Sequence, residues 1–193
     1  MPRGKGKVST GEAQGQYNIE THPYNDLIIP QLRVRKNEMD FLHDNMPAPG
    51  LLQQPIHGWT HILHMLVYAS LFCNYGTFHL EVVRWAIITH DSGRYHDDLQ
   101  ESVHPAMGAY VAASMIKKGE LRVDADKVPL IVARHNLTDD SFCNEEAILR
   151  ACDRLDLWRL PNFRGINSGL VTAPGWRKVE VIAKRLRLEG KMP

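Results

Sequence analysis

The stretch AIITHDSGRYHDD, residues 86–98, decides how the rest of the chain is interpreted. Apolar and β-branched residues run directly into the adjacent pair His90 and Asp91. Burying an unpaired carboxylate costs several kcal/mol, so Asp91 must have a partner if it lies at the end of a buried segment. We expect no residue nearby in the sequence to supply that partner.

The bulk composition predicts one soluble globular domain. The chain has 193 residues, of which 44% are hydrophobic and 23% charged, and its formal net charge is +1. This length suits a single core, and the charge indicates no nucleic-acid partner. Residues 1–22 are polar and rich in Gly, Lys and Gln, so we expect a flexible or partner-ordered tail there, followed by a single helical domain over 23–193.

Cysteine usage and hydropathy predict a cytoplasmic protein. Cys73, Cys143 and Cys152 are an odd number and form no C-x-x-C pair, which is typical of a reducing compartment. The N-terminus has no apolar h-region, and no run has the length of a transmembrane helix. We therefore expect neither secretion nor a membrane span.

The hydrophobic periodicity predicts an all-α fold, a compact helical bundle. Apolar residues recur at spacings of three and four, and no segment shows a convincing period-two strand pattern. The expected helices are about 30–45, one following His57, one from a Thr77 cap to Asp91, one beginning at His104 with Pro105 in its first turn, one ending at His135, and one capped by Asn144. The helix before His90 is apolar nearly all round, which is typical of a central buried helix.

Residues suited to metal binding recur on the faces that should point into this bundle. Taken singly, an inward histidine is usually a hydrogen-bonded core residue, and an inward aspartate is usually a cap or an ion-pair partner. The six together are the nitrogen and oxygen donor set of a divalent metal held between facing helices. They are His61, His90, Asp91, His104, His135 and Asp153. A metal would also neutralise Asp91.

The order of these residues resembles a known family. His61 in HILHMLVYA, the HD pair at His90 and Asp91, and Asp153 in ACDRLD resemble the signature of the HD-domain metal-dependent phosphohydrolases, a helical superfamily, over about residues 55–160. The resemblance implies that these four residues bind a metal and that Asp91 also takes part in catalysis.

Two further motifs resemble a subset of that superfamily. His104 in HPAMGA and His135 in ARHN are similar to the extra histidines with which cyclic-nucleotide and cyclic-dinucleotide phosphodiesterases hold a second metal. The interval from Asp91 to His104 is shorter than in those enzymes, and RHN replaces a His-His pair. One metal and two metals per chain both remain open.

The resemblance implies hydrolysis of a phosphate ester, of a nucleotide as the expected class, by a metal-activated water. Arg94 stands where such members often have a Lys, and it would stabilise negative charge on the phosphoryl group. Mixed nitrogen and oxygen ligation suits Mn, Fe, Co, Ni, Zn or Mg. The expected partner is a small phosphorylated substrate, with a homo-oligomer left open.

Other functions remain as alternatives. The chain would also fit a non-catalytic HD-type module that binds a nucleotide or a metal, an HD-fold metal oxygenase, or a structural helical protein with incidental histidines. His57 and His61 form an H-x-x-x-H spacing as in zinc proteases, but Gly58 stands where the catalytic glutamate would be, which excludes that chemistry. His57 is expected either to support a metal ligand from behind or to line the pocket, and His64, His79 and His96 to be structural or surface residues.

Overall fold

A computed structural model describes residues 22–45, 57–94, 103–119, 123–160 and 165–192. Nearly all of the predicted tail therefore lies outside the described residues. The elements, in chain order, are η2 Pro23–Leu27, η3 Pro30–Leu32, α1 Lys36–Asn45, α2 Trp59–Phe72, α3 Leu80–Thr89, α4 His104–Gly119, α5 Lys127–Arg134, α6 Asn144–Asp156, η5 Leu157–Arg159, η6 Ser168–Leu170 and α7 Trp176–Leu188. The described part holds no strand, which confirms the predicted all-α fold.

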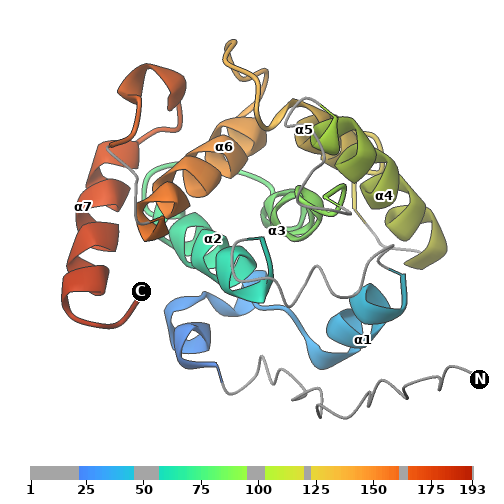
Figure 1. The fold of residues 1–193 in the computed structure, drawn as a ribbon, viewed down its shortest axis with the longest axis horizontal. Helices are drawn as coiled ribbons and strands as arrows, with labels where there is room; N and C mark the ends of the chain where they lie inside the picture. Colours follow the sequence, from blue (N-terminus) through green and yellow to red (C-terminus); the bar gives the residue numbers. More distant parts are fainter. Residues whose placement is uncertain (1–21, 46–56, 95–102, 120–122, 161–164, 193) are drawn as a thin grey trace, which may run out of the picture.

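Helix α3 lies at the centre of the molecule. Figure 1 looks along its axis and shows α2, α4, α5 and α6 around it, and each of them packs against it. Every residue of α3 from Val82 to Thr89 is buried, as its all-round apolar sequence predicts. The C-terminal end of α3 therefore brings His90 and Asp91 to a point that four other helices surround.

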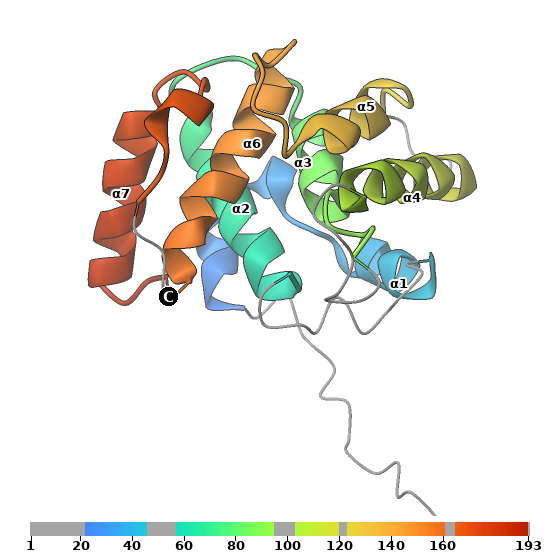
Figure 2. The same cartoon turned by 45° about the horizontal axis from the view of Figure 1, so that its top comes forward.

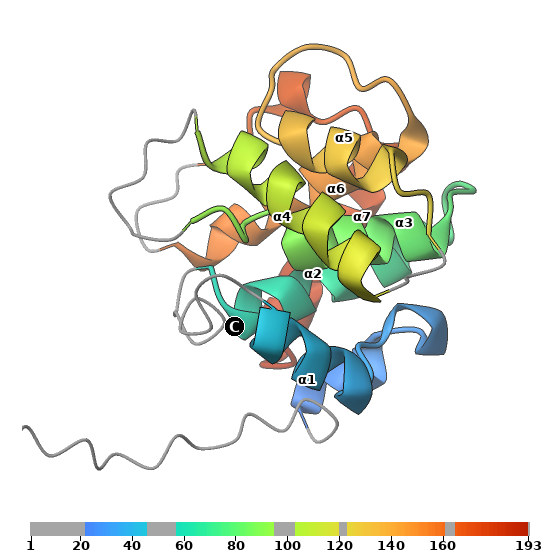
Figure 3. The same ribbon diagram turned by 90° about the vertical axis from the view of Figure 1, so that its right-hand side faces the viewer.

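The remaining helices cover the outside of this arrangement. Helix α7 lies against α2 and α6 at one edge (Figure 2). Helices α4 and α5 lie side by side on another face (Figure 3). Helix α1 is tied to α3 by the buried Arg84, whose Nη1 donates to Glu38 Oε2 at 2.8 Å. In the described part, no helix is long and apolar enough to cross a membrane.

Three predicted helix starts are wrong. The helix expected over 30–45 begins only at Lys36, because Pro30 starts a separate short 3-10 helix and the chain between the two is extended. Helix α3 begins at Leu80 with His79, not Thr77, at the N-cap position. Helix α6 has Cys143 at its N-cap position, since the Asn144 side chain instead donates to the carbonyl of Thr77.

Glycines let α4 approach the end of α3 closely. A Cβ added at Gly108 would lie 2.6 Å from the carbonyl oxygen of His90 and 3.3 Å from that of Thr89. One added at Gly93 would lie 2.3 Å from the carbonyl oxygen of His104. Both contacts are with backbone atoms, which cannot turn aside as a flexible side chain would. The close spacing of α3 and α4 next to His90 is thus possible because Gly93 and Gly108 have no Cβ atom.

We expect Gly108→Ala to lower the free energy of unfolding by about 1–2 kcal/mol, because the added methyl group overpacks the α3–α4 contact. Alanine favours a helix over glycine by about 1 kcal/mol, so a net loss has to come from packing. Urea denaturation measures the change. Gly76→Ala is the matched control, because a Cβ there meets nothing within 4 Å. Equal stabilities of the two variants would contradict the prediction.

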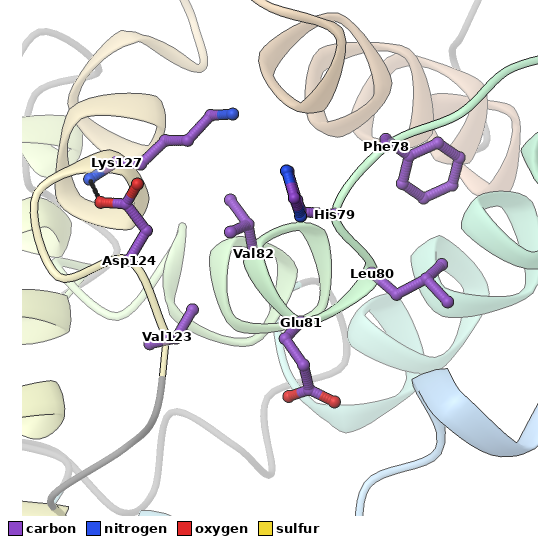
Figure 4. A pocket seen from close by; sticks show the side chains of 8 residues that line it. All are labelled: Phe78, His79, Leu80, Glu81, Val82, Val123, Asp124 and Lys127. Atoms are coloured by element: carbon purple, nitrogen blue, oxygen red, sulfur yellow. Dashed lines mark hydrogen bonds between the residues drawn. The ribbon is translucent and has the colours of Figure 1, made fainter.

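A pocket of about 440 Å³ lies at the other end of α3, between its first turn and the start of α5 (Figure 4). Lys127 is in its wall, and its Nζ lies 2.9 Å from Oε2 of Glu145. The other oxygen of Glu145 accepts from the backbone N–H of His79 at 2.9 Å. Burial raises the pKa of Glu145, but these two partners outweigh it and lower the pKa to about 2.

This lowered pKa makes the pair a source of acid sensitivity. The folded state holds Glu145 ionised better than the unfolded chain does, so its contribution is present above pH 4.5 and is lost as the pH falls towards about 2. We expect Glu145→Gln to cost about 1 kcal/mol at pH 7, a value reduced by the partial exposure of Lys127, and to cost less as the pH falls through that range. Denaturation of both proteins at a series of pH values tests this. The exposed Asp140→Asn serves as control, and a penalty for Glu145→Gln that is constant with pH would refute the assignment.

Candidate metal centre

The six predicted ligands come from five segments that converge at the C-terminal end of α3. His61 is on α2, His90 and Asp91 directly follow α3, His104 is the first residue of α4, His135 directly follows α5, and Asp153 is on α6. The four histidines and Asp91 are buried, whereas the side chain of Asp153 is 30% exposed. The structure thus brings all six into one region.

The first cluster consists of His61, His90 and Asp91, whose ligand atoms all lie within 4.8 Å of one another. Nε2 of His61 and Nε2 of His90 are 3.2 Å apart. Oδ2 of Asp91 lies 3.4 Å from the His90 nitrogen and 3.9 Å from the His61 nitrogen. Asp153 stands beside this cluster, with Oδ1 3.4 Å from Nε2 of His61.

The second cluster consists of Asp91, His104 and His135. The two Nε2 atoms of the histidines are 3.0 Å apart. Oδ1 of Asp91 lies 3.5 Å from Nε2 of His104 and 4.0 Å from Nε2 of His135. Asp91 therefore directs one carboxylate oxygen to each histidine pair.

The hydrogen bonds of the other ring nitrogens show which atoms are free to bind a cation. Nδ1 of His90 lies 2.7 Å from the carbonyl oxygen of Ile87, and Nδ1 of His135 lies 2.7 Å from that of Val132. A carbonyl only accepts, so both Nδ1 atoms carry a proton. In the neutral ring, the Nε2 atom then holds a lone pair directed into the cluster.

The same reasoning applies to His104. Arg94 places Nη2 3.2 Å from its Nε2, and a guanidinium only donates, so this nitrogen also presents a lone pair. Nε2 of His135 lies 3.0 Å from the same nitrogen.

The donor set fits a divalent metal in each cluster. Zinc–nitrogen and zinc–oxygen bonds are about 2.0–2.2 Å long, so two ligands of one ion lie roughly 3.0–3.5 Å apart. Most of the distances between donor atoms fall in this range or slightly above it. Imidazole nitrogens combined with carboxylate oxygens are typical ligands of first-row transition metals. His61, His90, Asp91 and Asp153 could hold one ion, and Asp91, His104 and His135 another.

Electrostatics shift the pKa values of His61 and His135 in opposite directions. Burial lowers the pKa of His135 to about 4, with the neighbouring His90 adding to the effect, so His135 is neutral at pH 7. Burial would also lower the pKa of His61, but the carboxylates of Asp153 and Asp156 raise it to about 9. A metal that binds to His61 therefore displaces a proton.

Asp91 has one partner nearby in the sequence, Arg94, contrary to expectation. The chain turns helically after α3, with the N–H of Arg94 bonded to the carbonyl of Asp91, and this places Nε of Arg94 2.9 Å from Oδ1 of Asp91. His57 lies on the other side, with Nδ1 2.8 Å from Oδ2. Burial raises the pKa of Asp91, but the neighbouring His90, the bond from His57 and the charge of His61 hold it well below its usual range. Asp91 is thus an ionised, paired carboxylate.

Asp156 is a functional candidate for which the sequence analysis predicted no role. Its carboxylate is fully buried, and Oδ2 lies 2.6 Å from Nδ1 of His61. His64, expected to be structural or at the surface, is buried and lies 2.8 Å from Oδ1 of the same carboxylate. Burial raises the pKa of Asp156, and the bonds from His61 and His64 more than offset this, so the pKa is lowered. The available signal was its position three residues after Asp153, on the same helix face.

His79 and His57 differ in their distance from the metal centre. His79 is exposed at the start of α3, consistent with a surface residue. His96 lies outside the described residues, as do the other residues of the interval 95–102. His57 is at the open side of the centre, with its side chain 23% exposed. Arg94 and Asp153 are partly exposed on the same centre.

Comparison with protein-family models matches the chain to the HD domain over residues 58–158. The chain belongs to the HD domain family. The match covers more than half of the 193 residues and contains all six clustered residues. The resemblance to the HD-domain metal-dependent phosphohydrolase superfamily is thereby confirmed, and divalent metal binding is the chemistry that this superfamily implies. Comparisons with curated proteins and with solved structures gave no match.

We expect Mn²⁺ to raise the melting temperature of this HD domain, because an ion that binds only the folded state stabilises it by about 2.7 kcal/mol at 100 times its Kd. A chelator should reverse the shift, and Asp91→Asn should remove most of it, since Asp91 contacts both clusters. Thermal melts with and without Mn²⁺ test this. His79→Ala is the control that should keep the full shift. A wild-type melting temperature that does not change on addition of Mn²⁺ would contradict the assignment of these residues as a metal centre.

Proposed function

We propose that the protein is a metal-dependent phosphohydrolase that cleaves a phosphate ester, with nucleotides as the substrate class, using two divalent ions per chain. The observation that carries this proposal is the position of Asp91, which directs one oxygen to each of two histidine pairs. A carboxylate that bridges two ions about 3.5–4 Å apart is the usual arrangement of two-metal phosphate chemistry. The HD domain match supports the same reaction class.

The metal ions would supply a Lewis acid for the phosphoryl oxygens and a water whose pKa is lowered towards neutrality. The protein's own residues determine where this occurs. The buried histidines hold the inner side of the site and exclude bulk water from it. Asp153 is the more exposed of the proposed ligands, and an ion held there could take water and substrate from the solvent side.

Arg94 is proposed to bind the phosphoryl group. Its side chain is only 15% exposed, and its guanidinium already lies beside Asp91 and His104 at the open side of the centre. A guanidinium in this place offers a planar fork of donors to phosphate oxygens and stabilises the negative charge that develops on them. Because it also contacts Asp91, Arg94 would help to orient that carboxylate.

The test is a panel of nucleotides and other phosphate esters, assayed for phosphate or nucleotide release with Mn²⁺, Co²⁺, Zn²⁺ and Mg²⁺ in turn. We expect wild-type turnover that a chelator abolishes. Asp91→Asn should lose about 10³-fold or more in rate, because a bridging ligand is weakened. Arg94→Lys should lose less, because it keeps the charge but not the fork. Metal analysis by atomic emission should give two ions per wild-type chain.

His79→Ala is the matched control, an exposed histidine at the far end of α3, and it should retain full activity. Bound metal without turnover of any ester would favour the non-catalytic binding module instead. Oxygen consumption without phosphate release would favour an oxygenase. A wild-type protein that binds only one ion after reconstitution with excess Mn²⁺ would overturn the two-metal arrangement.

A further inference from the structure

The carboxylate of Asp156 joins the metal centre to the C-terminal helix. It is completely buried, and its two oxygens are shared between two histidines of α2. Oδ2 accepts from Nδ1 of His61 at 2.6 Å, and Oδ1 accepts from Nδ1 of His64 at 2.8 Å. Because each oxygen has its own histidine one helical turn from the other, the carboxylate cannot rotate without breaking one of these bonds.

Two arginines compensate the charge of this carboxylate. Nη1 of Arg159 lies 2.7 Å from Oδ2, and Nη2 of Arg187 lies 3.5 Å from Oδ1. Arg187 also donates from Nη2 to the hydroxyl of Tyr68, which in turn donates to Oδ1 of Asp156 at 3.4 Å. A buried carboxylate is tolerated only with such partners. Arg187 belongs to α7, which lies beyond the HD domain match at residues 58–158.

The hydrogen bond between His61 and Asp156 determines which ring nitrogen of His61 can bind a metal. A carboxylate that accepts from Nδ1 keeps the proton on that nitrogen, so Nε2 is the atom left for the metal. It also fixes the ring plane and makes the ring a better donor. Among the metal-facing histidines, His90 and His135 use backbone carbonyls for the same purpose, whereas His61 uses a charged side chain.

We propose that Asp156 is a positioning residue for the metal ligand His61 and that Arg187 of α7 holds Asp156 in place. The C-terminal helix thus contributes, through Arg187 and Asp156, to the metal affinity of the first cluster. This inference rests on the proposed metal site. It predicts that loss of Asp156 weakens metal binding by the first cluster, which contains His61, and not by the second. The second cluster contains neither His61 nor any contact with Asp156 among the bonds of His104 and His135 that the structure describes.

The experiment measures Mn²⁺ affinity in two backgrounds, by electron paramagnetic resonance of the free ion. His135→Ala leaves the first cluster as the intact one, and His61→Ala leaves the second. Adding Asp156→Asn should weaken Mn²⁺ binding about 10–100-fold in the His135→Ala background, as loss of a ligand's supporting carboxylate does. It should leave binding unchanged in the His61→Ala background.

Glu146→Gln is the matched control for a merely structural effect. Glu146 is also fully buried on α6 and also paired with arginines, Arg150 and Arg134, but its described contacts include none of the metal-facing residues. It should lower the melting temperature without changing Mn²⁺ affinity. Equal Mn²⁺ affinities with and without Asp156→Asn in the His135→Ala background would overturn the inference, as would an equal loss in both backgrounds.

Arg187→Met tests the same relation if Asp156→Asn fails to fold. It should weaken Mn²⁺ binding in the His135→Ala background, though less than Asp156→Asn. Arg185→Met is its control, because Arg185 is exposed on the same helix and pairs with Glu189. Equal affinities of these two variants would refute the role of α7. Failure of the proposed function looks different, because it would appear as no Mn²⁺ binding, or no hydrolysis, in the wild-type protein.

Discussion

The placement of the Asp91 carboxylate between two pairs of histidines is the constraint on which the rest of the structure depends. Four of the surrounding Nε2 atoms lie within 4.0 Å of its oxygens. To place a carboxylate there, α3 must end in the middle of the molecule, and four helices must direct their histidines or aspartates to that end. The central position of α3, its all-round apolar surface and the glycine contact with α4 all serve this geometry.

Each metal-facing histidine described below is also held by a hydrogen bond at its other ring nitrogen, Nδ1, and the partner differs from one histidine to the next. His90 and His135 each bond to the carbonyl three residues earlier, so their rings are fixed by the helix ends that carry them. His61 lies in the first turn of α2, and its Nδ1 bonds instead to a side chain of another helix, Asp156. The position of each ligand within its helix thus decides which kind of partner it requires.

Much of the fold and the candidate centre could be predicted because periodicity and order are local properties of a sequence. The burial of Val128, Ile131, Val132 and His135 follows from their spacing, and the HD signature follows from the order of its residues. The start of α3 could not, because Asn144 bonds to Thr77 from 67 residues away. The roles of Asp156 and of Arg187, 31 residues later, depend equally on contacts between distant segments.

The close contact at Gly108 determines at which stage of folding the metal-binding site forms. The metal-facing side chains come from segments separated by up to 92 residues of chain, from His61 to Asp153, and they meet only when α4 rests against the carbonyl groups at the end of α3. Partly folded forms, in which these helices have formed but have not docked, would carry every ligand and no binding site. The affinity for metal is therefore a direct report of native packing, and conditions that loosen the helices would release the ions before the helices themselves unfold.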